Sequence, residues 1–132
     1  MVIHVDVADK DLKKCLRKRW YPGLEIELKR ILKLLLIDGQ LPGETLMSDF
    51  DSDLAGCIYH ARISLPKTSF GKRKGPRLVF FRNTTIIGEY SLKVLYVGGH
   101  KDRIYGTARF VEIVKTRCLD VANLISYEEF AY

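Results

Sequence analysis

The stretch Cys57–Leu65, which reads CIYHARISL, decides the class of fold. Its apolar and aromatic residues stand at every second position, and three of the four residues between them are polar or charged: His60, Arg62 and Ser64. A period of two is typical of a half-buried strand. We therefore predict a strand here and expect its apolar face to meet a core. That face consists of Cys57, Tyr59, Ala61, Ile63 and Leu65.

Two further strands are predicted downstream. A turn region rich in Lys, Gly and Arg, Pro66–Pro76, leads to the apolar run Leu78–Arg82, and Leu92–Val97 follows. The turn between these two runs is placed either at Asn83–Thr84 or at Gly88–Glu89. Consecutive strands with short connections usually pair as neighbours, so we predict an antiparallel sheet of three consecutive strands.

The sequence before this sheet predicts a strand and two helices. Ile3–Val7 alternates like a short opening strand. Asp9 is placed as the cap of a helix that runs to Trp20, with apolar residues on one side and Lys and Arg on the other. Gly23–Ile37 has apolar residues every three or four positions and ends at Asp38–Gly39. The two helices are expected to form an antiparallel hairpin.

A polar, acidic connection, Gln40–Gly56, joins the second helix to the sheet, and Tyr105–Leu119 has mixed helical spacing. We interpret residues 1–132 as a single domain in which 110–132 form a C-terminal helical extension. The predicted order is β-α-α-β-β-β-α. This is an α+β fold in which an N-terminal strand and a two-helix hairpin pack on an antiparallel sheet.

Composition indicates a cytoplasmic protein with an anionic partner. The net charge is +6, and the stretch from Ile58 to Arg109 holds eleven Lys and Arg against two acids. The three cysteines are too few and scattered for a disulfide framework, and none lies in a Cys/His cluster, so no metal site or cofactor is expected. The apolar run Ile31–Ile37 is far shorter than the roughly 20 residues that span a bilayer, so no membrane partner is expected.

Two clusters could carry chemistry. In Gly71–Arg77 two glycines bracket three consecutive cations; glycine lets backbone approach a ligand, and clustered cations neutralise phosphate. This stretch is also what a solvated hairpin loop looks like, and it lacks the spacing of a phosphate-binding P-loop. His100–Tyr105, directly after the last strand, offers an imidazole, a guanidinium and a phenol. If the strands pair as consecutive neighbours, both clusters lie at one end of the sheet.

With these motifs in this order, the chain resembles the RelE/ParE superfamily of type II toxin–antitoxin toxins. The resemblance rests on five elements across about 100 residues, and each is short. The Gly-Lys-x-x-Gly-x-Arg element is similar to the RelE-like and HigB-like ribonuclease branches. The five elements are Lys10–Arg19, Gly23–Gly39, Tyr59–Ile63, Gly71–Arg77 and Leu92–Tyr105.

The resemblance implies a ribosome-dependent, metal-independent endoribonuclease that cleaves mRNA, inhibits translation and is held by a cognate antitoxin. Transferred by position, Arg77 would stabilise the phosphorane, and Lys72 and Lys74 would hold the backbone or act as base. His100 would be the general acid, with Arg103 and Tyr105 supporting or replacing it. The residues expected to bind RNA are Arg62, Lys67, Arg73 and Lys101.

Two other functions stay open. A ParE-like toxin would inhibit DNA gyrase by binding, without RNA chemistry, and a nucleic-acid-binding module would use the same basic face only to hold phosphates. The chain also departs from members that use a Glu as general base, because no acid lies in Lys67–Arg82. The sequence leaves both the proton acceptor and the oligomeric state undetermined.

Overall fold

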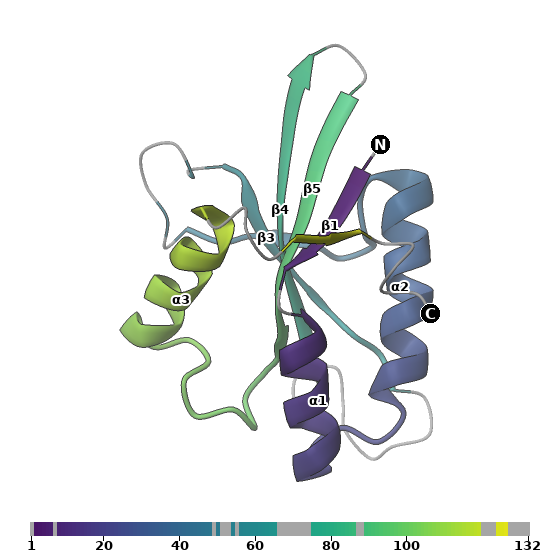
Figure 1. Ribbon diagram of the computed structural model, residues 1–132, viewed down its shortest axis with the longest axis vertical. Helices are drawn as coiled ribbons and strands as arrows, with labels where there is room; N and C mark the ends of the chain where they lie inside the picture. Colours follow the sequence, from purple (N-terminus) through teal and green to yellow (C-terminus); the bar gives the residue numbers. More distant parts are fainter. Residues whose placement is uncertain are drawn as a thin grey trace.

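The protein forms one six-stranded sheet with helices on both of its faces, as the computed structural model shows (Figure 1). The order of strands across the sheet is β2-β3-β4-β5-β1-β6. Helices α1 and α2 cover one face and α3 covers the other. The residues that the structure describes are 2–6, 8–48, 50, 54, 56–65, 75–86, 89–119 and 124–126.

Three consecutive strands form the antiparallel centre of this sheet: β3 (Ile58–Arg62), β4 (Arg77–Ile86) and β5 (Glu89–Gly98). This confirms the predicted trio. Both longer strands exceed their predicted limits, and β4 runs through Asn83–Thr84, so the prediction of a turn there is wrong. The other predicted turn, at Gly88–Glu89, is compatible with β5 beginning at Glu89, although residue 88 lies outside the described residues.

The first strand, β1 (Val2–Asp6), lies inside the sheet and pairs in parallel with β5. Its other side pairs antiparallel with β6 (Leu124–Ser126). The alternating pattern predicts β1. The prediction of a helical extension over residues 110–132 is wrong at Leu124–Ser126, which form β6. The described chain instead leaves the helical conformation after Leu119 and returns to the sheet.

Strand β2 (Thr45–Leu46) forms the opposite edge, within a segment that we predicted to be a connection. A half-buried ion pair holds this segment in place. The guanidinium of Arg82 donates to both carboxylate oxygens of Glu44, at 2.9 and 2.6 Å, and to the carbonyl of Gly39 at 3.0 Å. The same guanidinium lies 4.3 Å from the ring centroid of Tyr59. These contacts are tertiary, so local sequence does not reveal them.

The two-helix hairpin packs where it was expected. Helix α1 (Ala8–Lys18) begins one residue before Asp9, which therefore lies in its first turn and not at its cap. Helix α2 (Leu24–Asp38) starts after Gly23 and ends at Gly39, both in the left-handed conformation that glycine tolerates. Its buried stripe packs against β3, β4 and β5. That stripe is Leu24, Leu28, Ile31, Leu32 and Leu35.

Helix α3 (Ala108–Leu119) covers the other face of the sheet. Its buried Phe110 and Val114 pack with Val79, Leu95 and Tyr96 from the strands. The predicted helix started at Tyr105, but the chain from there to Thr107 forms turns. In the described part of the chain, no helix has the length and apolar character needed to cross a membrane.

Candidate functional site

The candidate site lies where β3 ends, β4 begins and β5 ends. Arg62 of β3 stands opposite Arg77 of β4, and Arg77 stands opposite Gly98 of β5. Directly opposed residues point to the same face of a sheet. The two arginines therefore share the face covered by α3, and the loop that follows Gly98 passes beside them. This end of the sheet is the lower end in Figure 1.

Arg77 is the inner cation of this site. Its side chain is buried, with the residue only 4% exposed, and Nη1 donates to the carbonyl of Gly75 at 2.5 Å. Burial lowers the pKa of Arg77, Tyr105 opposes that shift, and the charge of Arg62 adds to it. An arginine keeps its proton at neutral pH in such surroundings. Arg77 therefore contributes a fixed positive charge below the surface, whereas Arg62 is exposed.

Tyr105 connects this cation pair to the loop. Its ring stacks on Tyr96 at a centroid distance of 5.8 Å and meets His100 edge to face at 5.2 Å. Burial raises the pKa of the Tyr105 phenol, while the charges of Arg77 and Arg62 pull it down. The phenol is thus neutral at physiological pH and can donate a hydrogen bond, and the exposed His100 lies against its ring.

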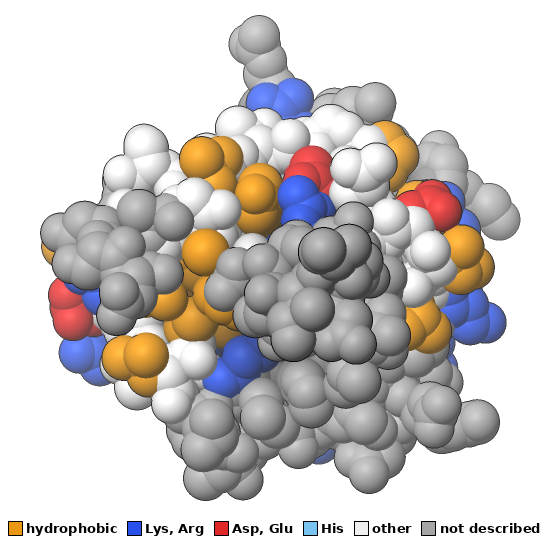
Figure 2. Space-filling view, turned by 90° about the horizontal axis from the view of Figure 1, so that it is seen from above, with side chains coloured by type: hydrophobic (Ala, Val, Ile, Leu, Met, Phe, Trp, Pro, Cys, Tyr) orange, Lys and Arg blue, Asp and Glu red, His pale blue; other side chains and the backbone are white. Residues whose placement is uncertain are grey.

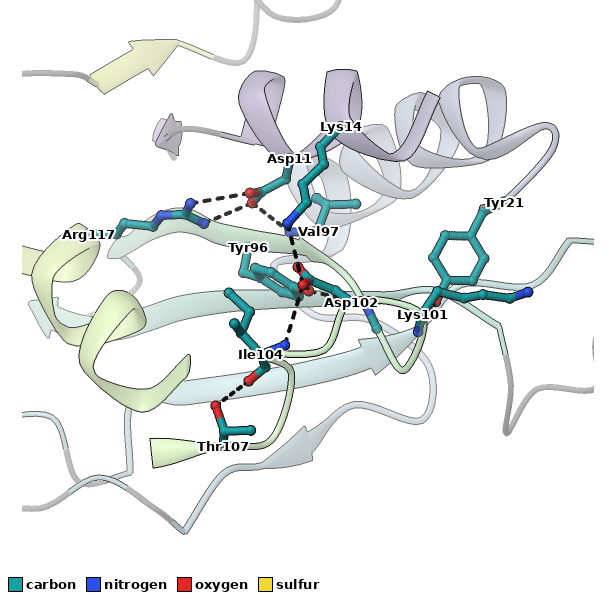
Figure 3. Close-up of polar contacts among 11 residues, drawn as sticks. Asp11, Lys14, Tyr21, Tyr96, Val97, Lys101, Asp102, Ile104, Thr107 and Arg117 are labelled. Carbon is teal, nitrogen blue, oxygen red and sulfur yellow. Dashed lines mark hydrogen bonds and ion pairs between the residues drawn. The ribbon is translucent and has the colours of Figure 1, made fainter. Parts of the chain in front are cut away.

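Asp102 holds the loop in shape, as Figure 3 shows. Its carboxylate accepts hydrogen bonds from the Tyr96 hydroxyl at 2.9 Å, the Lys14 ammonium at 3.4 Å and the Ile104 N–H at 3.4 Å. Its own N–H donates to the carbonyl of Gly99 at 2.9 Å. Sequence reasoning counted this residue only as an opposing charge. The available signal was that Asp102 is one of two acids among the eleven Lys and Arg of Ile58–Arg109, which indicates a counter-ion for neighbouring cations.

Gly99 allows the loop to turn close to the rest of the site. Its φ is +147°, and a Cβ there would lie 3.0 Å from the Tyr21 hydroxyl and 3.3 Å from the carbonyl of Gly75. That hydroxyl accepts a hydrogen bond from the N–H of Lys101 at 3.2 Å, which ties the loop to the segment after α1 (Figure 3). The loop is therefore fixed from two sides.

A second polar cluster fastens α3 to the sheet and to α1. Arg117 donates to both carboxylate oxygens of Asp11, at 2.9 and 3.2 Å (Figure 3). It also donates to the carbonyl of Leu95 at 3.0 Å. Asp11 also accepts from the N–H of Val97 at 3.0 Å. Burial raises the pKa of Asp11 to about 6, although Arg117 and that N–H act against the shift. Lys93 donates to the last carbonyls of α3, those of Arg117 and Cys118.

The structure brings together some of the residues proposed from the sequence. Arg77, Tyr105 and His100 lie in one cluster, and Arg62, expected only to bind RNA, lies beside them. Lys101 and Arg103 are exposed on the same loop. Four further candidates lie outside the described residues, and these are Lys67, Lys72, Arg73 and Lys74.

The opposite end of the molecule has a different surface. In its described part, Lys and Arg side chains are interleaved with hydrophobic and acidic ones (Figure 2). Among the side chains that the structure describes, no three His, Cys, Asp or Glu residues are grouped so that they could hold a metal ion. Searches of family models, curated proteins and solved structures find no match to this chain.

Proposed function

We propose that the chain is a type II toxin that cleaves mRNA on the ribosome as a metal-independent endoribonuclease. The observation that carries the proposal is the convergence of Arg62, Arg77, Tyr105 and His100 at one end of the sheet. A pair of guanidinium groups suits a phosphate, and a phenol and an imidazole beside them suit proton transfer. The resemblance to RelE-like and HigB-like toxins supports the same reading.

In the proposed reaction the 2′-hydroxyl of the RNA attacks the adjacent phosphorus. The 2′ oxygen loses its proton as the new O–P bond forms, the bond from phosphorus to the 5′ oxygen breaks, and that oxygen takes up a proton. The products are a 2′,3′-cyclic phosphate and a 5′-hydroxyl. Negative charge builds on the phosphorane oxygens, and fixed cations in a partly dry site stabilise such charge most effectively.

Each residue is assigned one step of this proposed reaction. Exposed Arg62 contacts the phosphate, and buried Arg77 adds fixed charge from beneath. His100 protonates the leaving 5′ oxygen, and Tyr105 orients the imidazole and donates to a phosphate oxygen. Lys72 or Lys74 takes the 2′ proton, and Arg103 and Lys101 bind neighbouring phosphates. We also propose that a cognate antitoxin protein binds the chain and that the chain acts in the cytoplasm.

A specific observation favours one alternative, a module that binds RNA without cutting it. Arg77 is 4% exposed and donates to a backbone carbonyl, so part of its hydrogen-bonding capacity is already used within the protein. In that case the cluster holds phosphates through Arg62 and stacks a base on Tyr105, and no bond breaks.

The test measures binding and cleavage separately. Purified protein is added to ribosomes programmed with a defined mRNA, and the cut ends are mapped by primer extension. We expect cleavage within the decoded codon, with a 2′,3′-cyclic phosphate end and no loss in EDTA beyond that caused by ribosome dissociation. His100→Ala should reduce the rate by 10²–10⁴-fold, the usual contribution of a positioned acid. Lys33→Ala, an exposed site on α2, serves as control.

The outcomes separate the two candidates. Tight RNA binding without any cleavage would select the binding module. Full activity in both His100→Ala and Tyr105→Phe would remove the site from the mechanism.

A further inference from the structure

A cavity of about 610 Å³ opens between α2 and the outer edge of β3. Its size lies within the range of roughly 300–1,000 Å³ that is usual for small-ligand sites. Residues of α2, of the turn before β2 and of β3 meet around it. The lining residues used below are Arg30, Ile31, Leu34, Leu41, Thr45, Ala61, Arg62 and Ser64.

The walls of this cavity combine apolar surface with positive charge. Ile31, Leu34 and Leu41 form one side, and none of the described residues that line the cavity is acidic. Arg30 forms an ion pair with Glu27 at 2.9 Å, so its charge is partly compensated. Arg62, which is exposed at the edge of β3, adds a second positive charge beside the cavity. A ligand with an apolar body and a negative group matches these residues.

The edge of β3 adds hydrogen-bonding groups from the backbone. The carbonyl of Ile58 accepts from Met47 on the side of β2, whereas the N–H of Ile63 donates to Pro76 on the side of β4. Alternate residues of a strand direct their N–H and C=O to opposite sides. Arg62 and Ser64 therefore direct their backbone groups to the same side as Ile58, and both residues line the cavity. Such groups match the donor and acceptor edge of a nucleobase.

The cavity adjoins the candidate site through a shared residue. Arg62 lines the cavity, stands opposite Arg77 in the sheet and lowers the pKa of Tyr105 by its charge. A single strand of RNA whose phosphate lies at Arg62 can direct the base of a neighbouring nucleotide around the edge of β3. Bases of unpaired RNA are commonly read in this way, splayed out of the stack and held in a pocket.

We propose that this cavity is a nucleotide subsite, in which one base next to the cleaved bond packs against Ile31, Leu34 and Leu41 and its phosphate pairs with Arg62. The proposal rests on the proposed function in one respect, since it takes RNA as the substrate. The subsite would determine which nucleotide beside the scissile bond is preferred, and Arg62 is the residue that it shares with the groups proposed to perform the chemistry.

The experiment uses the four nucleoside 5′-monophosphates as probes, with the ¹⁵N-labelled full chain and without ribosomes. Amide shifts and calorimetry are measured for the wild type and for Leu34→Trp, which fills the cavity. Thr45→Trp fills it from the β2 side, where the residue is exposed, so the test survives if one variant fails to fold. Ile26→Trp is the matched control, because Ile26 lies on α2, is 73% exposed and does not line the cavity.

We expect at least one monophosphate to bind, with shifts at Leu34, Ala61 and Ser64. Both filling variants should weaken that binding at least tenfold, while Ile26→Trp leaves it unchanged. Leu34→Trp should also alter the preferred cleavage positions on mRNA. No binding, or shifts confined to residues 98–105, would overturn the subsite and leave the nuclease intact. Binding in the cavity by a chain that does not cleave RNA would retain the subsite and remove the proposed enzyme.

Discussion

Asp102 shows how a single side chain can prepare a site without touching a substrate. Its carboxylate is buried beside Tyr96, and the Tyr96 ring stacks on Tyr105, which meets His100. A buried carboxylate is costly unless it receives several hydrogen bonds, and here it has three donors. These hydrogen bonds therefore hold the loop in one conformation. Through the loop they also position Tyr105 and His100, the two groups proposed to move protons.

Replacing Asp102 by Asn should loosen that loop. The amide keeps the shape but loses the charge that pairs with Lys14, and we expect the free energy of unfolding to fall by about 1–3 kcal/mol. The cleavage proposed above should slow as well, because His100 is no longer held against Tyr105. Asp38→Asn, at the exposed end of α2, is the control for urea unfolding and for activity. Equal effects of the two substitutions would contradict the assigned role.

Two glycines allow a test of close packing in the same loop. Gly99 and Gly106 both have positive φ, but only a Cβ at Gly99 would meet other atoms. Gly106→Ala should cost about 1 kcal/mol, the strain of a left-handed residue. Gly99→Ala should cost at least about 1 kcal/mol more, because the Tyr21 hydroxyl and the Gly75 carbonyl must move. Thermal unfolding of the two variants measures this difference, and equal losses would show that the contacts at Gly99 relax freely.

At the scale of elements, α3 depends on a buried ion pair for its position. Arg117 reaches from α3 to Asp11 of α1 across the backbone of β5, so three elements share one contact. The pKa of Asp11, raised by burial to about 6, shows that desolvation outweighs the attraction of its partner at this place. Such a pair is weak support for stability but places the helix in one defined position.

Asp11 should therefore leave a signature in the pH dependence of stability. Its pKa is about 6 in the folded chain and about 3.9 in an unfolded one, so the folded state binds the extra proton between these values. This contribution to stability is fully present below pH 4 and is lost as the pH rises through 6. On going from pH 7 to pH 5, wild type should gain about 1 kcal/mol relative to Asp11→Asn. If the free energies of unfolding of wild type and Asp11→Asn, measured in urea at pH 7, 6 and 5, changed by the same amount, the raised pKa of Asp11 would be refuted.

The elements also show where sequence patterns succeed and where they stop. The strands β3 to β5 and the helix α2 follow from period and from breakers such as Gly39. The strand β2 has two residues and depends on the pair of Arg82 with Glu44, and β6 depends on the free edge of β1. In the site, the meeting of Arg77 with Tyr105 could be anticipated from strand order. Asp102 and the cavity beside Arg62 require the folded geometry.

At the scale of the whole molecule, the described charged side chains are arranged differently at its two ends. The lower end in Figure 1 combines Arg62, Arg77 and the cations of the loop 99–105, while the end seen in Figure 2 interleaves its cations with other side chains. A phosphate backbone should therefore bind at one end of the protein and not around it.

The dependence of RNA affinity on salt concentration tests whether the phosphate backbone binds at one end of the protein. The logarithm of the affinity for single-stranded RNA should fall linearly with the logarithm of the salt concentration, and each lost phosphate contact should reduce the slope by about 0.7. We expect that reduction for Arg62→Ala and none for Lys33→Ala, which is an exposed cation on α2. Fluorescence anisotropy with a labelled oligonucleotide measures both. Identical slopes for the two variants would indicate a diffuse basic surface.

The parallel strand β1 has a consequence for how the protein is made. Val2 pairs with Ser91, and Asp6 pairs with Leu124, so the residues of β1 find their partners only after the much later residues 91–126 have been synthesised. Such distant pairings are slow to close. A newly made chain should therefore have an unpaired β1 until residues 91–126 have been synthesised, so the complete sheet forms late.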